Sequence, residues 1–150
     1  MRKLLPTLLL ICLAALAPSA FAKTCALTID STDAMTFDKP QLNVDASCTQ
    51  VKLTLTHSGT LAANVMGHDW VLSKTADMAA INADGMKAGM AAGFLKAGDT
   101  RVIAHTKVIG GGQSDTITFS TATLSKGGDY TFFCSFPGHA SMMKGKFVFG

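Results

Sequence analysis

The amino-acid sequence predicts an all-β domain, an antiparallel sandwich or barrel, with one short helix inserted between strands. Several short segments alternate apolar and polar residues with a period of two, which is typical of strands buried on one face. Runs of glycine separate these segments and supply turns. Because many short strands with turns between them favour closed or paired sheets, we expect two packed sheets in one domain.

The clearest strand is predicted for residues 50–57, whose odd positions are apolar or histidine and whose even positions are polar. His57 therefore lies on the apolar face, where we interpret it as a buried structural or titrating histidine. Residues 129–134 are rich in aromatic side chains and would leave Cys134 at a strand end. Shorter alternating patterns occur at residues 42–44, 116–120 and 146–149, and glycine runs occur at residues 110–112 and 127–128.

A helical insertion is predicted near residues 75–85. Residues 75–83 contain helix formers, with Thr75 placed to cap the N-terminus and Asp77 in the first turn, where a negative charge complements the helix dipole. Gly85 could end the helix in a left-handed conformation. We expect a single helix or helical flap between two strands.

Residues 1–22 have the pattern of a signal peptide. Arg2 and Lys3 precede an apolar run at residues 8–16, and small residues occupy the two positions that a signal peptidase reads, Ala20 and Ala22. The run is short for a membrane span, and no later segment approaches about 20 apolar residues. We expect export to the periplasm without membrane insertion and one domain at residues 23–150; an uncleaved anchor is the alternative.

The charge of the chain excludes one class of partner. The 150 residues carry 13 basic side chains against 10 acidic ones, all of them Asp. Without Arg2 and Lys3 the balance is about +1, and the charges are scattered along the sequence. This balance is not typical of a nucleic-acid-binding domain.

The cysteine count predicts one disulfide and one remaining thiol. Cys12 lies in the signal peptide, which leaves Cys25, Cys48 and Cys134. In an oxidising compartment we expect a Cys25–Cys48 bond, whose loop would stabilise the fold by roughly 3 kcal/mol in the chain-entropy model. Cys134 is then a free thiol that needs protection or a use.

Residues 134–143 bring three possible metal ligands together: Cys134, His139 and Met143. A second histidine, His68, follows Gly67 far upstream, and the Gly67 carbonyl could approach a metal closely. Two His and one Cys in a trigonal set with a weak axial Met are typical of a blue-copper site. Thiolate and thioether favour Cu(I), whereas imidazole binds either oxidation state, so this donor set suits one-electron transfer.

Each of these residues alone has a simpler interpretation. Methionine usually fills a core, and an isolated His68 beside Trp70 would be an ordinary core or surface histidine. His105 is interpreted as a surface or strand-edge residue, and Trp70 as a packing residue. Only the combination of Cys134, His139 and a Met with the upstream Gly-His pair predicts a metal site.

Four motifs resemble the azurin family of cupredoxins: Asn64-Val-Met-Gly-His68, Asp84-Gly-Met86, Arg101-Val-Ile-Ala-His-Thr-Lys107 and Tyr130-Thr-Phe-Phe-Cys-Ser-Phe-Pro-Gly-His139. The resemblance covers residues 23–150 and includes the spacing of the disulfide cysteines. It implies an eight-stranded Greek-key sandwich that binds one copper ion. The implied ligands are Gly67, His68, Cys134, His139 and Met143, with Met143 as a distant axial ligand and the Gly67 carbonyl opposite it. Backbone N–H groups near Phe136 would donate to the thiolate.

The resemblance also implies an electron route through His139 beneath an apolar patch. The residues expected in this apolar patch are Met35, Leu61, Met66, Met86, Phe136, Pro137 and Ala140. Such a surface suits weak docking to redox proteins. The family's partners include c-type cytochromes, copper nitrite reductase and amine dehydrogenases.

The sequence departs from the family pattern at two places. Asp69 follows the expected ligand His68 where the family usually has Asn. An ionised carboxylate there should lower the reduction potential, whereas a neutral, hydrogen-bonded acid would have a smaller effect. Residues 140–142 also differ from the usual loop, which could alter the shape of the apolar patch and the choice of partner.

Two other functions compete with electron transfer, and zinc competes with copper for the site. A nucleophilic Cys134 activated by His139 would need an exposed thiolate and an orienting third group, and Met143 has no place in that chemistry. Copper storage or delivery would favour clustered Met motifs, which the sequence lacks. Zinc could also occupy a site of His and Cys ligands. The sequence therefore favours an electron carrier that is not an enzyme.

Overall fold

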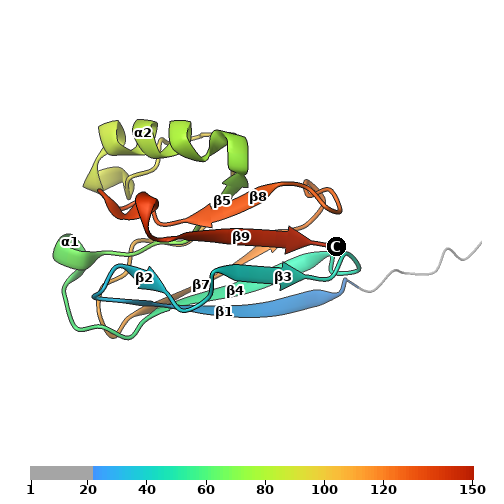
Figure 1. Ribbon diagram of the computed structural model, residues 1–150, viewed down its shortest axis with the longest axis horizontal. Coiled ribbons are helices and arrows are strands. Elements are labelled where there is room, and N and C mark those ends of the chain that lie inside the picture. The colour runs from blue at the N-terminus through green and yellow to red at the C-terminus, as the bar shows by residue number, and fades with distance from the viewer. Residues whose placement is uncertain (1–21) are drawn as a thin grey trace, which may run out of the picture.

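Two β-sheets pack face to face in the computed structural model, which describes residues 22–150 (Figure 1). The first sheet has the strand order β2-β1-β4-β7 and the second β3-β9-β8-β5-β6. The strands of the first sheet are β1 (Thr24–Thr32), β2 (Thr36–Phe37), β4 (Gln50–His57) and β7 (Ser114–Ser120). Those of the second are β3 (Gln41–Val44), β5 (Val71–Lys74), β6 (Val102–His105), β8 (Tyr130–Phe133) and β9 (Lys144–Phe149). Apart from Ala22, the expected signal peptide lies outside the described residues.

The predicted alternation of β4 is confirmed. Val51, Leu53, Leu55 and His57 are all buried, and the residues between them are exposed or half-buried. Their apolar faces meet the second sheet around Trp70, which is fully buried. The Trp70 ring packs against Phe132, Phe119 and Phe147 at centroid separations of 6.0–6.2 Å. Trp70 is thus a packing residue, as expected.

The strand directions differ from the expectation of antiparallel sheets. β1 pairs with β4 in parallel and β3 pairs with β9 in parallel, whereas the other pairs are antiparallel. Both sheets are therefore mixed, and they form a sandwich of nine strands rather than a closed barrel. Alternation shows which face of a strand is buried, but it carries no information on the direction of its neighbour.

The predicted helical insertion is present but extends further. A 3₁₀ turn, η1 (Thr75–Asp77), leads into α2 (Met78–Ala88), which covers the outer side of β5 and β8 (Figure 1). The Thr75 side chain does not cap the helix. Gly85 lies inside α2 rather than at its end, and its lack of a Cβ leaves room for the Phe94 carbonyl. The helix ends at Ala88, and the residue that caps it, Gly89, has a φ of 74°. Shorter helical turns that the sequence did not predict are α1 (Ala63–Met66), η2 (Met90–Ala92) and η3 (His139–Ser141).

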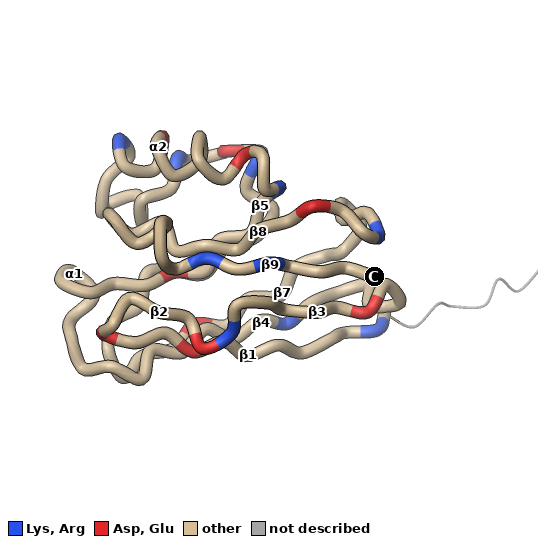
Figure 2. The backbone as a smooth tube through the Cα atoms, viewed as in Figure 1, with Lys and Arg blue, Asp and Glu red and all other residues tan. Residues whose placement is uncertain are grey.

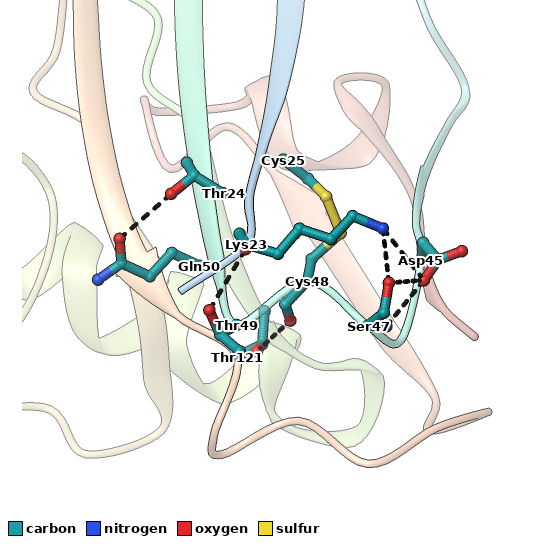
Figure 3. Close-up of a disulfide and its surroundings, with 9 residues drawn as sticks. All are labelled: Lys23, Thr24, Cys25, Asp45, Ser47, Cys48, Thr49, Gln50 and Thr121. Carbon is teal, nitrogen blue, oxygen red and sulfur yellow. Dashed lines mark hydrogen bonds and ion pairs between the residues drawn. A yellow bond between two sulfur atoms is a disulfide. The ribbon is translucent and has the colours of Figure 1, made fainter. Parts of the chain in front are cut away.

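The Cys25–Cys48 disulfide is confirmed and joins the start of β1 to the segment before β4 (Figure 3). The Cα atoms of the two residues are 5.8 Å apart. Thr121 donates a hydrogen bond of 2.7 Å to the Cys48 carbonyl, and Lys23 donates to Ser47 beside it. The disulfide thus links two segments at the end of the sandwich where the C-terminus also lies (Figure 1).

Charges of both signs are spread over the backbone (Figure 2). Along the described chain, Lys and Arg positions are scattered among Asp positions over both sheets and form no continuous basic stripe in this view. Within residues 22–150, no helix is both long enough and apolar enough to cross a bilayer.

Candidate metal centre

Three predicted ligands from two distant segments meet at the end of the sandwich opposite the disulfide. His68 lies between α1 and β5, where its backbone forms an isolated bridge with Ile109 through hydrogen bonds of 2.9 and 2.8 Å. Cys134 directly follows β8, and His139 begins η3. All three side chains are buried, with exposed fractions of 0%, 0% and 4%.

The ligand atoms form a small triangle. The Nδ1 atoms of His68 and His139 are 3.2 Å apart, and Cys134 Sγ lies 3.9 Å from the first and 3.6 Å from the second. Metal–nitrogen and metal–sulfur bonds of about 2.0–2.3 Å would place three trigonal donors roughly 3.5–3.7 Å apart. The triangle therefore fits one metal ion at its centre. In the described part of the chain, no other group of three such residues is close enough to hold a metal.

The C-terminal loop joins two strands of a hairpin. β8 ends before Cys134 and β9 begins at Lys144, and the Cys134 N–H donates to the Met143 carbonyl at 2.9 Å. The Met143 N–H in turn donates to the His139 carbonyl at 2.8 Å. Gly138 has a φ of 82°, so this turn favours glycine. The backbone of one hairpin thus holds Cys134, His139 and Met143 together.

Both imidazole rings are in the neutral form that can donate a nitrogen lone pair to a metal ion. Burial lowers the pKa of His68 to about 4, and burial also lowers the pKa of His139. The two rings are therefore neutral at pH 7. His68 Nε2 donates to the Thr32 carbonyl at 2.9 Å, which leaves Nδ1 without a proton and facing the other two ligands.

Burial of Cys134 disfavours its ionised form, so a stable thiolate needs a nearby positive charge. Burial raises the pKa of the Cys134 thiol well above its ordinary value, and the nearby Asp69 charge raises it further. The backbone N–H groups of Asp69 and Phe136 act in the opposite direction and lower the pKa of the thiol. A bound metal ion would supply the positive charge that the thiolate needs.

The two further expected ligands also lie at this end of the fold. Met143 is fully buried and packs in one cluster with Cys134, Phe136 and Phe94. Gly67 is buried where any side chain would collide with its surroundings. A Cβ there would lie 2.3 Å from the Ala63 carbonyl oxygen and 2.9 Å from the Phe136 ring. Gly67 is therefore required by the close packing of α1 against the hairpin.

Comparison with known proteins identifies the family of this metal centre. A sequence model described as copper binding proteins, plastocyanin/azurin family, matches residues 23–150. The chain belongs to the plastocyanin/azurin family. It is 56% identical over 133 residues to an azurin of Bordetella pertussis, which covers 89% of each chain. It is also 56% identical over 124 residues to an azurin of Pseudomonas chlororaphis, which covers 83% of this chain and 97% of the relative.

The fold agrees with this assignment to the plastocyanin/azurin family. The solved structure of the azurin Az-iso2 from Methylomonas sp. strain J superimposes with a TM-score of 0.81 at 41% identity. The match covers 84% of this chain and 98% of that one. The triangle of His68, Cys134 and His139 is consistent with the single type 1 copper ion that was predicted, because its soft and nitrogen donors match that metal.

Contacts beyond the ligands involve residues that the sequence did not indicate. Ser135 donates to the buried carboxylate of Asp69 through both its backbone N–H and its hydroxyl group. The Thr32 carbonyl orients His68 from the end of β1. These partners are 66 and 36 residues apart in the sequence, so no local pattern marks them. Only the fold brings them together.

The remaining histidines lie outside the ligand triangle, as expected. His57 is buried, and its ring centroid is 4.5 Å from that of His68. His57 Nε2 is 3.1 Å from Asp33 Oδ1. His105 is exposed at the end of β6, where its Nδ1 lies 3.0 Å from the Thr106 carbonyl oxygen.

The residues expected in the apolar patch differ in exposure. Leu61 and Met86 are 39% and 45% exposed. Met35, Met66 and Pro137 are half-buried, and Phe136 and Ala140 are buried. Three exposed apolar side chains that the sequence did not assign to the patch are Val65, Met90 and Met142. Met142 lies in the segment 140–142 that departs from the family pattern.

Proposed function

We propose that the chain is a periplasmic one-electron carrier that binds type 1 copper and passes electrons between redox proteins. The observation that carries this proposal is the buried triangle of His68, Cys134 and His139. Copper bound there would supply the chemistry by alternating between Cu(I) and Cu(II). Membership of the plastocyanin/azurin family supports the choice of copper over zinc.

The protein's own contribution is a donor set that its hydrogen bonds hold in place. The Thr32 carbonyl fixes the His68 ring, and the hairpin backbone fixes Cys134 and His139. Both imidazoles are already neutral, so only the thiol loses a proton on binding. A rigid donor set suits electron transfer because little rearrangement accompanies the change of oxidation state.

Met143 and the Gly67 carbonyl are proposed as weak further donors to a copper ion that His68, Cys134 and His139 would hold. The burial of Met143 in the cluster that contains Cys134 supports its part. The collision that any Cβ at Gly67 would cause supports a backbone role there. Both assignments complete the donor set that the family resemblance implies.

His139 and the apolar patch are proposed as the route to the partner. His139 lies under the surface at 4% exposure, and its ring is 4.8 Å from that of Phe136 in the patch. The exposed Leu61 and Met86 suit brief contact with another redox protein. Candidate partners are c-type cytochromes, copper nitrite reductase and amine dehydrogenases. Mixing the reduced protein with each of them and following the change in colour would identify the partner.

The periplasmic location is supported by two features. Residues 1–22 have the pattern of a cleaved signal peptide, and the Cys25–Cys48 disulfide suits an oxidising compartment.

A catalytic role for Cys134 as a nucleophile is disfavoured because its side chain is fully buried and cannot reach a substrate. The proposed function therefore involves no turnover of substrate.

Copper loading tests the proposal. Wild-type protein titrated with Cu(II) should bind one ion and turn intensely blue through thiolate-to-copper charge transfer. Cys134→Ser keeps the size of the side chain but removes the thiolate, so it should bind copper without the blue colour. A colourless wild-type Cu(II) complex with a reactive thiol would contradict the proposal.

A further inference from the structure

The carboxylate of Asp33 lies at the start of the turn between β1 and β2 and accepts hydrogen bonds from a distant segment. Oδ1 accepts from His57 Nε2 at 3.1 Å and from the Leu61 N–H at 3.3 Å. Oδ2 accepts from the N–H and the hydroxyl group of Thr60 at 2.8 and 3.3 Å. We call this set of bonds from Asp33 to residues 57–61 the Asp33 clasp. The Asp33 side chain is 31% exposed, so it is neither a core residue nor a free surface charge.

The carboxylate in this clasp is ionised and can only accept. The Thr60 N–H, followed by the other donors, lowers the pKa of Asp33 below its ordinary value. His57 Nε2 must therefore carry the proton in its contact with Asp33. Gly59 is part of the same arrangement, because a Cβ at this position would lie 2.2 Å from Asp33 Oδ1.

The clasp reaches the ligand His68 from two sides. Thr32, the residue before Asp33, accepts the Nε2 hydrogen bond of His68 through its carbonyl at 2.9 Å. His57, which Asp33 holds from the other side, packs its ring 4.5 Å from the His68 ring. One carboxylate thus fixes both the acceptor of the His68 N–H and the ring that packs against it.

We infer that Asp33 is a positioning residue of the metal centre, which holds the β1–β2 turn against residues 57–61 and thereby sets the orientation of the His68 imidazole. The inference rests on the proposed function only in taking His68 as a metal ligand. Asp33 itself touches no ligand atom in the hydrogen bonds described. A role confined to stabilising the turn would change the melting temperature and leave the His68 ring unaffected.

Two variants disrupt the clasp in different ways. Asp33→Asn replaces one acceptor oxygen by an NH₂ group, which must then face either the His57 or the Thr60 donor. Gly59→Ala keeps every charge and drives a methyl group into the carboxylate. Asp38→Asn is the matched control, because Asp38 has a side chain of similar exposure beyond β2 and accepts from the Asp30 N–H at 2.8 Å. It makes none of the clasp contacts.

The readout is the exchange rate with solvent of the His68 Nε2 proton, measured by NMR in the metal-free and the Cu(I)-loaded protein. We expect Asp33→Asn and Gly59→Ala to accelerate exchange at least tenfold, and Asp38→Asn to stay within twofold of wild type. The copper hyperfine splitting in the electron paramagnetic resonance spectrum of the Cu(II) form should change in the same two variants.

Wild-type exchange in folded Asp33→Asn would overturn the inference. If that variant does not fold, wild-type exchange in Gly59→Ala would overturn it equally. The measurement on the metal-free protein separates failure of the Asp33 inference from failure of the proposed function, because it does not require copper. A wild-type protein that binds no copper would refute the function, whereas a normal blue protein with unchanged His68 exchange in the clasp variants would refute only the role of Asp33.

Discussion

Asp69 accepts two hydrogen bonds from Ser135, each of 2.6 Å, one from the backbone N–H and one from the hydroxyl group. Both residues are fully buried, and each is next to a predicted copper ligand, His68 or Cys134. Burial raises the pKa of Asp69, but the two donors from Ser135 favour the carboxylate. An ionised carboxylate accepts both bonds, whereas a protonated one would donate to the Ser135 hydroxyl group, and the reduction potential of Asp69→Asn distinguishes the two states.

Asp69→Asn should raise the reduction potential. The carboxylate places a negative charge behind the thiolate, which favours Cu(II) over Cu(I), and the amide removes that charge. We expect an increase of about 60 mV, which corresponds to a tenfold shift for one electron. Redox titration at neutral pH checks this. An unchanged or lower potential would show that the carboxyl group is not ionised in the copper protein.

Loss of the disulfide should weaken the fold without changing the metal centre. The double variant Cys25→Ser and Cys48→Ser opens a loop with a sequence separation of 23 residues, which should lower the free energy of unfolding by roughly 3 kcal/mol. The blue absorption should stay the same, because β1 begins beside the disulfide and reaches the site only at Thr32. Denaturant unfolding and the visible spectrum measure the two effects; a shifted absorption band would contradict their independence.

Arg101 should fasten α2 to the sandwich in a pH-dependent way. Its guanidinium donates to Asp99 and, at 2.8 Å, to Asp84 on α2. The hydrogen bonds from Arg101 to Asp99 lower the pKa of Asp99 to about 2. A carboxyl group whose pKa is lower in the folded state stabilises the fold above pH 3.8, and that contribution disappears as the pH falls toward 2. Asp99→Asn should therefore lower the melting temperature by about 3 °C at pH 7.

The difference between wild type and Asp99→Asn should shrink as the pH is lowered from 4 to 2. Calorimetry at several pH values measures it. Asp38→Asn serves as a comparison, since no Arg contacts that carboxylate. A difference that is the same at pH 7 and pH 2 would mean that Asp99 acts through packing rather than charge.

A charge in the apolar patch should slow electron exchange with a redox partner. Leu61→Asp places a carboxylate on the exposed part of the patch and should reduce the second-order rate constant about tenfold, because the charge must be desolvated on docking. Ala122→Asp, an exposed position just after β7, adds the same charge at the other end of the sandwich. Stopped-flow measurements with one c-type cytochrome give the second-order rate constants of the two variants and of wild type. Equal rates in the two variants would place the docking surface elsewhere.

The sequence predicted those parts of the molecule that depend on local patterns. The alternation at residues 50–57 identified β4. The close spacing of Cys134, His139 and Met143 predicted that they lie together, since a short loop must keep them close. Strand direction and the true end of α2 were not predictable. Gly85 allows a close approach within the helix instead of ending it.

Contacts between distant segments could not be predicted from local sequence. The Thr32 carbonyl that orients His68, the Ser135 donors to Asp69 and the Asp33 clasp all depend on which loops meet at one end of two sheets. Common polar residues such as Thr and Ser carry no signal of such roles until the fold is known. His68 itself was identified only through the family resemblance and its pairing with the C-terminal loop.

Repeated redox cycling of the copper-loaded protein tests the central claim most directly. The blue absorption should bleach on reduction with one electron per protein and return to its full intensity on oxidation, with the copper retained through every cycle. A carrier must behave in this way because its buried ligands hold both oxidation states. Release of copper on reduction would contradict the account and favour copper handling instead.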